Sequence, residues 1–179
     1  MICLEFLQSV SLTPAERSVK VGIRRFTWGF VSQLRFSGGP ELTLDGKGRL
    51  TVPARWREQI NEQFQGQLVL SKDPAGCLGL YPPPIWAQLA AVVARLKAKD
   101  ESWRRLYLGH ANELQIDSAS RILLPPELRR WAGMKEGGPI IFMGVGAYFE
   151  LWDIARYEAH EAQAIAKGRP DELLEMEFE

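Results

Sequence analysis

The segment Leu42–Ile60, LTLDGKGRLTVPARWREQI, places Lys47 between two glycines and Arg49 at the start of an alternating apolar run. An arginine offers a planar fork of donors for a guanine edge or a phosphate, and a lysine offers a point charge for phosphate. Because glycine has no side chain, the backbone beside Lys47 can approach a surface closely. These residue types predict contact with nucleic acid through an exposed hairpin loop.

The acidic residue of this loop has another role. Asp45 is not expected to face phosphate, because like charges repel; it either closes the turn or holds Arg49 in place, and both roles remain open. Arg49 could also serve only as the partner of Asp45 in a salt bridge. Arg55 and Arg57, on the helix predicted to follow, are further candidates for DNA contact, or they pair with acidic residues of that helix.

The same pattern returns in Leu114–Ala132, LQIDSASRILLPPELRRWA, at a shift of 72 residues. The shift aligns Leu42 with Leu114, Asp45 with Asp117, Arg49 with Arg121, Pro53 with Pro125, and Arg57 with Arg129. The chain is therefore predicted to contain two copies of one unit of about fifty residues.

The two copies differ in the loop itself. Where the first has Gly46-Lys47-Gly48, the second has Ser118-Ala119-Ser120, so only Arg121 is basic there, with Asp117 as its orienting residue. We infer that the amino-terminal unit makes most of the DNA contact. The carboxy-terminal unit mainly completes the fold, with a weaker contact from Arg121.

Each unit predicts two short strands around the loop, a helix, and two further strands. The expected ranges are Leu42–Leu44, Arg49–Val52, Ala54–Gln63, Leu68–Leu70 and Leu78–Tyr81, then Glu113–Ile116, Arg121–Leu124, Pro126–Ala132, Ile140–Met143 and Ala147–Trp152. Further helices are expected from about Pro84, over Trp103–Leu108 and over Glu158–Lys167.

A fifty-residue unit is too small to bury a good core alone, so the two units are expected to pack together. The predicted fold is mainly β with helices (α+β), with one pseudo-symmetric β core flanked by helices. The expected parts are an extension or misread start over 1–36, a first repeat over 37–84, a helical linker over 85–110, a second repeat over 111–154, and a helix with an acidic tail over 155–179.

Composition limits the function classes. The formal net charge of the 179 residues is zero, so DNA binding must come from a local patch. Cys3, Cys77, His110 and His160 form no disulfide or zinc pattern, which fits a reducing cytosol. No constellation for catalysis, cofactor or metal is visible, and no run reaches the ~18 apolar residues that span a bilayer. We expect neither an enzyme, a membrane protein, nor a small-molecule binder.

Three stretches, DGKGRLTVPARWRE, LYLGHANELQIDSASRILLPPELRRWAG and FELWD, together resemble the MraZ family. That family belongs with the AbrB/SpoVT-like swapped-hairpin DNA-binding proteins, and its hallmark is a D-x-x-x-R motif in each half. The motif stands here as Asp45 to Arg49 and as Asp117 to Arg121. The resemblance implies tandem swapped-hairpin β-barrel units.

The resemblance also implies a function. It predicts a transcriptional regulator, usually a repressor, of the bacterial division and cell-wall gene cluster. Such a protein binds direct repeats of double-stranded DNA upstream of its own operon, as a ring of identical chains on the nucleoid. It further implies a native start near Val31. The rival hypothesis is an antitoxin-like or ring-forming protein-interaction module that reads no operator.

The ring answers a physical difficulty. A loop with two cations binds DNA with a dissociation constant of only about 10⁻⁴–10⁻⁶ M at physiological salt. Several identical loops, held at fixed spacing, engage adjacent repeats at high effective concentration. A neutral chain is therefore compatible with DNA binding only if its loops are multiplied.

Overall fold

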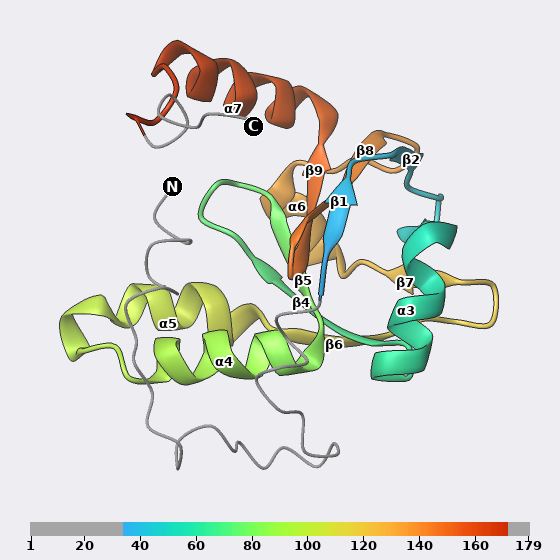
Figure 1. The fold of residues 1–179 in the computed structure, drawn as a ribbon, viewed down its shortest axis with the longest axis horizontal. Helices are drawn as coiled ribbons and strands as arrows, with labels where there is room; N and C mark the ends of the chain where they lie inside the picture. The colour runs from blue at the N-terminus through green and yellow to red at the C-terminus, as the bar shows by residue number, and fades with distance from the viewer. Residues whose placement is uncertain (1–33, 172–179) are drawn as a thin grey trace, which may run out of the picture.

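The computed structural model describes residues 34–171. Its strands are β1 (Phe36–Gly38), β2 (Glu41–Thr43), β3 (Arg49–Thr51), β4 (Gln67–Lys72), β5 (Leu78–Tyr81), β6 (Asn112–Gln115), β7 (Arg121–Leu123), β8 (Pro139–Gly146) and β9 (Tyr148–Asp153). The central sheet has the order β1-β8-β9-β5-β4-β6, and β2 also pairs with β8 (Figure 1). β3 and β7 form a separate two-stranded antiparallel ribbon.

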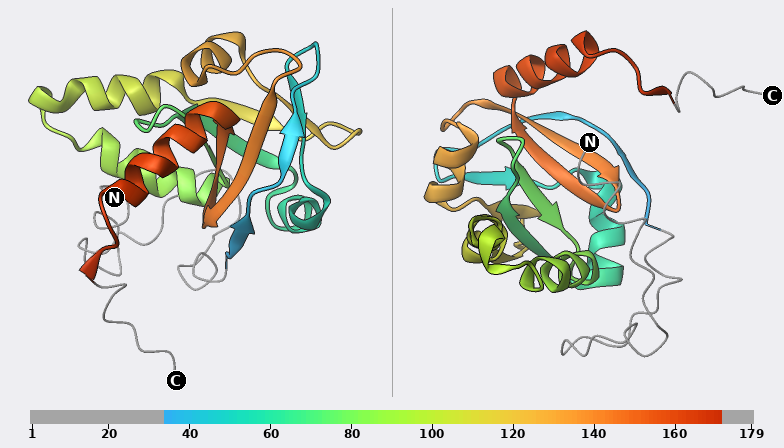
Figure 2. Two further views of the ribbon diagram at one scale, coloured as in Figure 1. Left: turned by 90° about the horizontal axis from the view of Figure 1, so that it is seen from above. Right: turned by 90° about the vertical axis from the view of Figure 1, so that its left-hand side faces the viewer.

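The helices are α3 (Ala54–Phe64), α4 (Pro83–Ala94), α5 (Glu101–Tyr107), α6 (Pro126–Ala132) and α7 (Ile154–Ala166), with short 3-10 turns η1 (Ala98–Asp100) and η2 (Leu108–His110). α4 and α5 lie side by side on one side of the sheet, and α7 projects on the opposite side (Figures 1 and 2). The predicted α+β class is confirmed.

The strands around each predicted loop pair across the two halves of the chain. β2 of the first half pairs with β8 of the second, and β6 of the second half pairs with β4 of the first. The ribbon likewise joins β3 of one half to β7 of the other. Neither half can therefore complete its sheet alone, which explains why the two units share one core.

That core is built from both halves. Leu50 and Ile122, the central residues of the ribbon, are buried beneath it. The ring of Trp56 on α3 lies 5.3 Å from that of Phe142 and 5.0 Å from that of Phe149, measured between centroids. Aromatic rings at these spacings add to the stability already gained from burying apolar surface.

The amino-terminal boundary differs from the sequence-based expectation. Residues 1–33 of the predicted extension lie outside the described range, as do residues 172–179 of the acidic tail. Residues 34–36 are described, and there Leu34 and Phe36 are buried. Phe36 begins β1, opposite Gly146 of β8. The core thus begins before the first predicted repeat.

The carboxy-terminal helix also begins earlier than predicted, at Ile154 instead of Glu158. Asp153 explains the shift, because its carboxylate accepts a hydrogen bond of 3.2 Å from the backbone N–H of Arg156 and so caps the helix. None of the helices within residues 34–171 has the length and apolar character needed to cross a membrane.

Candidate nucleic-acid interface

The β3–β7 ribbon has one buried face and one outward face. Leu50 pairs with Ile122 across the ribbon, and both side chains point into the core. Because side chains alternate along a strand, the residues on either side of this central pair point outward. They form two cross-strand pairs, Arg49 with Leu123 and Thr51 with Arg121.

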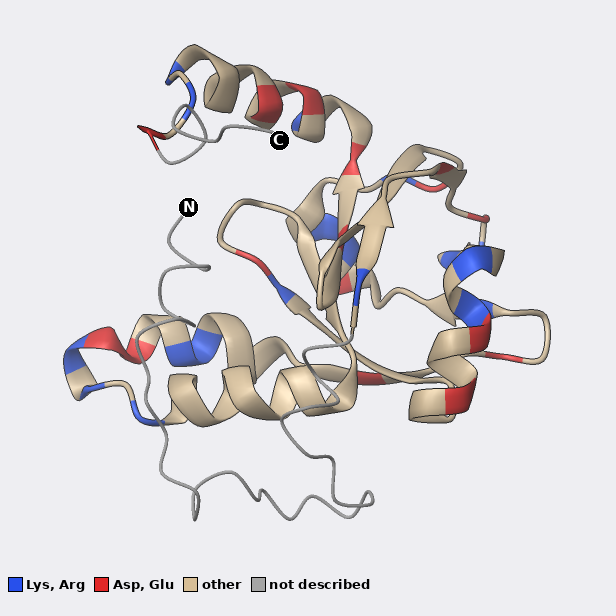
Figure 3. Ribbon diagram, in the orientation of Figure 1, with Lys and Arg blue, Asp and Glu red and all other residues tan. Residues whose placement is uncertain are grey.

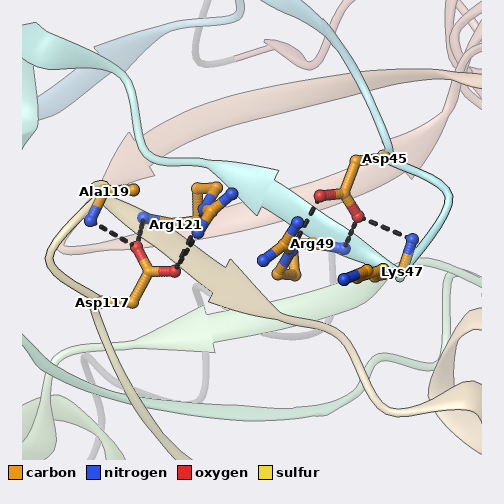
Figure 4. Close-up of polar contacts among 6 residues, drawn as sticks. All are labelled: Asp45, Lys47, Arg49, Asp117, Ala119 and Arg121. Atoms are coloured by element: carbon orange, nitrogen blue, oxygen red, sulfur yellow. Dashed lines mark hydrogen bonds and ion pairs between the residues drawn. The ribbon is translucent and has the colours of Figure 1, made fainter.

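The first turn holds Arg49 by a ring of hydrogen bonds to Asp45. One carboxylate oxygen, Oδ1, accepts from the backbone N–H groups of Lys47 and Arg49, each at 2.9 Å. The other, Oδ2, accepts from Nε of Arg49 at 2.8 Å (Figure 4). Gly48 completes the turn with φ 77°, a left-handed conformation that glycine adopts without steric penalty.

The second turn repeats this geometry around Asp117. Its Oδ1 accepts from the backbone N–H groups of Ala119 and Arg121, at 2.9 and 2.8 Å (Figure 4). Its Oδ2 accepts from Nε and Nη2 of Arg121, at 3.0 and 2.9 Å. Ser120 takes the place of Gly48 and keeps the positive φ, at 62°. The Asp and Arg define the turn, whereas the residues between them can change.

The turns are joined to the ribbon at opposite ends. The carbonyl of Gly48 accepts from the backbone N–H of Leu124, and that of Ser120 accepts from Val52, both at 2.9 Å. Each turn is thereby fixed to the strand of the other half. The two predicted loops therefore lie at the two ends of a single surface.

Hydrogen bonding keeps both aspartates ionised. The backbone N–H of Arg49 is the main cause that lowers the pKa of Asp45 to about 2. For Asp117 the side chain of Arg121 is the main cause of a lowered pKa. At neutral pH each carboxylate is thus an anion surrounded by donors, which keeps its arginine in one orientation.

The two arginines differ in what they have left to offer. Arg49 gives only Nε to Asp45, and within residues 34–171 its two terminal Nη atoms have no protein acceptor. Arg121 gives both Nε and Nη2 to Asp117. Their side chains are 29% and 30% exposed, and Lys47 is exposed in the first turn. Arg121 keeps both N–H groups of Nη1 and one of Nη2, so both arginines present a terminal two-pronged edge that can bind a guanine, and Arg49 has one more N–H to give.

The other predicted DNA-contacting arginines lie on α3 and are used differently. Nη2 of Arg57 donates to the carbonyl of Val52 at 3.0 Å instead of pairing with an acidic residue of its helix. The guanidinium of Arg55 lies 4.5 Å from the ring centroid of Trp56 and close to Gly38 of β1. Figure 3 shows these basic residues on the first turns of α3 and acidic residues farther along it. The structure does not join them to the outward face of the ribbon.

Two residues near the ribbon were not singled out from the sequence. Arg129 lies beneath the first turn, where a Cβ atom at position 48 would come within 2.8 Å of its Cζ. The shift of 72 residues already aligned it with Arg57, which donates to the carbonyl of Val52 just before α3. Leu123 is an exposed apolar side chain on the outward face, and strand alternation from Arg121 could have placed it there.

Both histidines contact neighbouring side chains. Nε2 of His110 lies 3.0 Å from Nζ of Lys72, and the ring of His160 packs against that of Trp152 at 5.0 Å. Cys77 is fully buried, and burial raises the pKa of its thiol. Over the described range, no three His, Cys, Asp or Glu side chains gather where they could hold a metal ion.

A family model for the MraZ protein, described as antitoxin-like, matches the chain twice, over residues 36–106 and 107–173. This chain belongs to the MraZ family. The two MraZ matches divide the chain in tandem, in agreement with the internal repeat.

Curated MraZ relatives resemble most of the chain. A transcriptional regulator MraZ from Methylibium petroleiphilum is 43% identical over 148 residues, which cover 83% of this chain and 100% of the relative. Proteins of the same name from Burkholderia cenocepacia and Burkholderia vietnamiensis are each 45% identical over 143 residues, or 80% of this chain and 99% of theirs. All three MraZ relatives are named for regulation of transcription.

Proposed function

We propose that this chain is a sequence-specific DNA-binding transcriptional regulator whose β3–β7 ribbon enters the major groove. The observation that carries the proposal is the outward face of the ribbon, where Arg49 and Arg121 stand together, each held by its own aspartate. The major groove, about 12 Å wide, admits a two-stranded β-ribbon. Lys47, in the exposed first turn, supplies a contact to phosphate.

The spacing of the two arginines suits one groove. Arg49 lies opposite Leu123, and Arg121 lies two residues before Leu123, so the arginines are diagonal neighbours. Such neighbours have Cα atoms roughly 7–8 Å apart, about two base-pair steps of 3.4 Å. Arg49 reads a base edge with its free terminal nitrogens. Arg121, held by two bonds to Asp117, positions the ribbon on the backbone.

One ribbon gives few contacts, so the proposal includes assembly. We infer a ring of identical chains whose ribbons engage direct repeats upstream of the protein's own operon and repress the division and cell-wall genes, on the nucleoid in the cytoplasm. The support is the zero net charge of the chain together with its small basic face. Specific regulators bind about 4–10 kcal/mol more tightly than non-specific contact does, and repetition of the ribbon supplies that difference.

A second function is favoured by one finding, the antitoxin-like description of the family model. In that case the ribbon or another face binds a protein partner, and the chain reads no operator. The two functions differ in salt dependence. DNA binding through phosphates weakens steeply as salt rises, because counterions are released when the complex forms.

The test measures binding of the full chain to a fluorescent duplex of the DNA that precedes its own gene, across a series of salt concentrations. A shuffled duplex of the same composition is the control. We expect a steep loss of affinity with salt and a preference of at least a hundredfold for the native duplex. Equal binding to both duplexes, or a flat salt response, would refute operator reading and leave the protein-binding alternative.

A further inference from the structure

Leu123 is an exposed apolar side chain at one end of the ribbon, beside two arginines. Its exposed fraction is 55%, and it is the one strand residue among the three large apolar side chains that are exposed in residues 34–171, the others being Trp103 and Ile165. A single exposed leucine needs no explanation by itself. Its neighbours on the ribbon make this leucine different.

Those neighbours are cations. Arg49 lies directly opposite Leu123, and Arg121 lies two residues earlier on the same strand and therefore on the same face. An apolar protein surface that covered Leu123 would also take these guanidinium groups out of water, at a large desolvation penalty. A polyanion that carries an apolar group beside its charges can pair with the guanidinium groups and also cover Leu123. The charge of the surroundings therefore selects nucleic acid as the occupant.

DNA offers one such apolar group in the major groove, the C5-methyl of thymine. Side chains directly opposite each other on a ribbon have Cβ atoms about 4.5–5.5 Å apart, close enough to reach adjacent bases. We propose that Leu123 reads the methyl group of a thymine next to the base that Arg49 contacts. This inference rests on the proposed function, since it requires the outward face of the ribbon to enter the groove.

The other end of the ribbon shows what the leucine adds. Thr51 occupies the equivalent place, opposite Arg121, and offers one methyl group and a hydroxyl. The pair Arg49 with Leu123 and the pair Arg121 with Thr51 are thus related by position but not by chemistry. Because its two ends differ, the ribbon would read DNA in one direction only. This fits the direct repeats of the proposed function, which all point in one direction.

The experiment removes the methyl group from the DNA and the leucine from the protein. Duplexes of the DNA preceding the gene are made with deoxyuridine in place of thymine, first throughout and then at single positions of each repeat. We expect the wild-type chain to lose affinity by about fourfold per contacted methyl group, the factor that corresponds to ~0.8 kcal/mol for one buried carbon. Leu123→Thr, which copies Thr51 and leaves a shorter side chain with one methyl group, should show a clearly smaller difference between thymine and deoxyuridine at that position.

Ile165→Thr is the matched control, because it removes an exposed apolar side chain on α7, far from the ribbon. It should keep the full methyl dependence. Circular dichroism should show that Leu123→Thr is folded, because Leu123 is an exposed strand position where threonine is favourable.

The outcomes separate the two proposals. If the wild-type chain shows no preference for its upstream DNA, both fail. If it prefers that DNA but Leu123→Thr keeps the same response to deoxyuridine, only the reading of thymine by Leu123 is overturned. If Leu123→Thr changes the mass of the assembly in light scattering, Leu123 is a contact between subunits and the inference is likewise overturned.

Discussion

The two turns of the molecule have the same frame and different contents. Asp45 and Asp117 each accept from two backbone N–H groups and from the side chain of an arginine four residues later. Lys47 has no basic counterpart in the second turn, where Ala119 stands. In both turns the bonds to the aspartate hold an arginine, whereas the residues between the aspartate and the arginine decide how much positive charge the turn displays.

The arginines extend this difference. Arg121 is bound to Asp117 through two nitrogens and Arg49 to Asp45 through one. The second bond holds Arg121 more rigidly, and both guanidinium groups keep the Nη1–Nη2 edge that can bind DNA. Because the first turn also displays Lys47, we expect it to make more of the contact with DNA.

Replacement of the arginines is expected to give the largest difference. Arg49→Ala should weaken binding to the upstream duplex by about tenfold or more, because a good bidentate contact to a base contributes roughly 1–3 kcal/mol. Arg121→Ala should weaken it only about two- to fivefold. Titration by fluorescence anisotropy gives both values.

The two variants control for each other, since each leaves one aspartate without its arginine. Light scattering on the two variants should show an assembly of unchanged mass. Equal losses of affinity would show that the two ends of the ribbon contribute alike, contrary to the assignment of recognition to the first turn.

Substitution of the residue before each arginine is expected to give the next largest effect, which is on the stability of the fold. Gly48→Ala forces an alanine into the left-handed conformation, at φ 77°, and brings its Cβ atom within 2.8 Å of Cζ of Arg129. The substitution should therefore destabilise the fold by about 1–2 kcal/mol. Ser120→Gly removes the steric cost of a positive φ but raises the conformational entropy of the unfolded chain. Because these two effects oppose each other, the stability of the variant should stay within about 1 kcal/mol of wild type. Urea unfolding measures both, and similar midpoints for the two variants would contradict the expected asymmetry.

Giving the second turn the residues of the first tests directly whether those residues set the affinity for DNA. Replacing Ser118-Ala119-Ser120 by Gly-Lys-Gly gives the second turn the contents of the first, and should raise affinity for DNA a few-fold at low salt. Its salt dependence should steepen by about one unit of slope for each added phosphate contact. The single change Ala119→Lys separates the charge from the glycines. An unchanged slope in both variants would place the second turn away from phosphate.

Much of this comparison could be predicted from the sequence. The shift of 72 residues aligned both Asp–Arg pairs, and β5 and α6 have the predicted bounds of Leu78–Tyr81 and Pro126–Ala132. These features are local, because turn chemistry and apolar periodicity depend on neighbouring residues.

Features that depend on distant pairing could not be predicted in this way. β1 was missed because three residues containing a glycine have no periodicity, and their partner is β8, about a hundred residues later. The sequence also does not determine which nitrogens of Arg121 bind Asp117. Those bonds follow from how β3 and β7 orient the two turns in the folded chain.

The smallest predicted effect concerns the aspartate pKa values. Both are lower in the folded chain than the ordinary 3.8, so each ionised carboxylate stabilises the fold above that pH. This stability is lost as the pH falls below 3.8, and for Asp45 the loss continues through its folded pKa of about 2. The causes differ, since a backbone N–H dominates for Asp45 and the arginine side chain for Asp117.

Removal of each arginine should expose this difference in cause. In Arg49→Ala the backbone N–H of residue 49 remains, so the pKa of Asp45 should stay well below 3.8. In Arg121→Ala the main cause is lost, so the pKa of Asp117 should rise further, although the backbone N–H groups of residues 119 and 121 still lower it. Titration of the carboxyl carbons by NMR in ¹³C-labelled protein measures both. If the two values rose equally, the two turns would hold their aspartates by the same interaction.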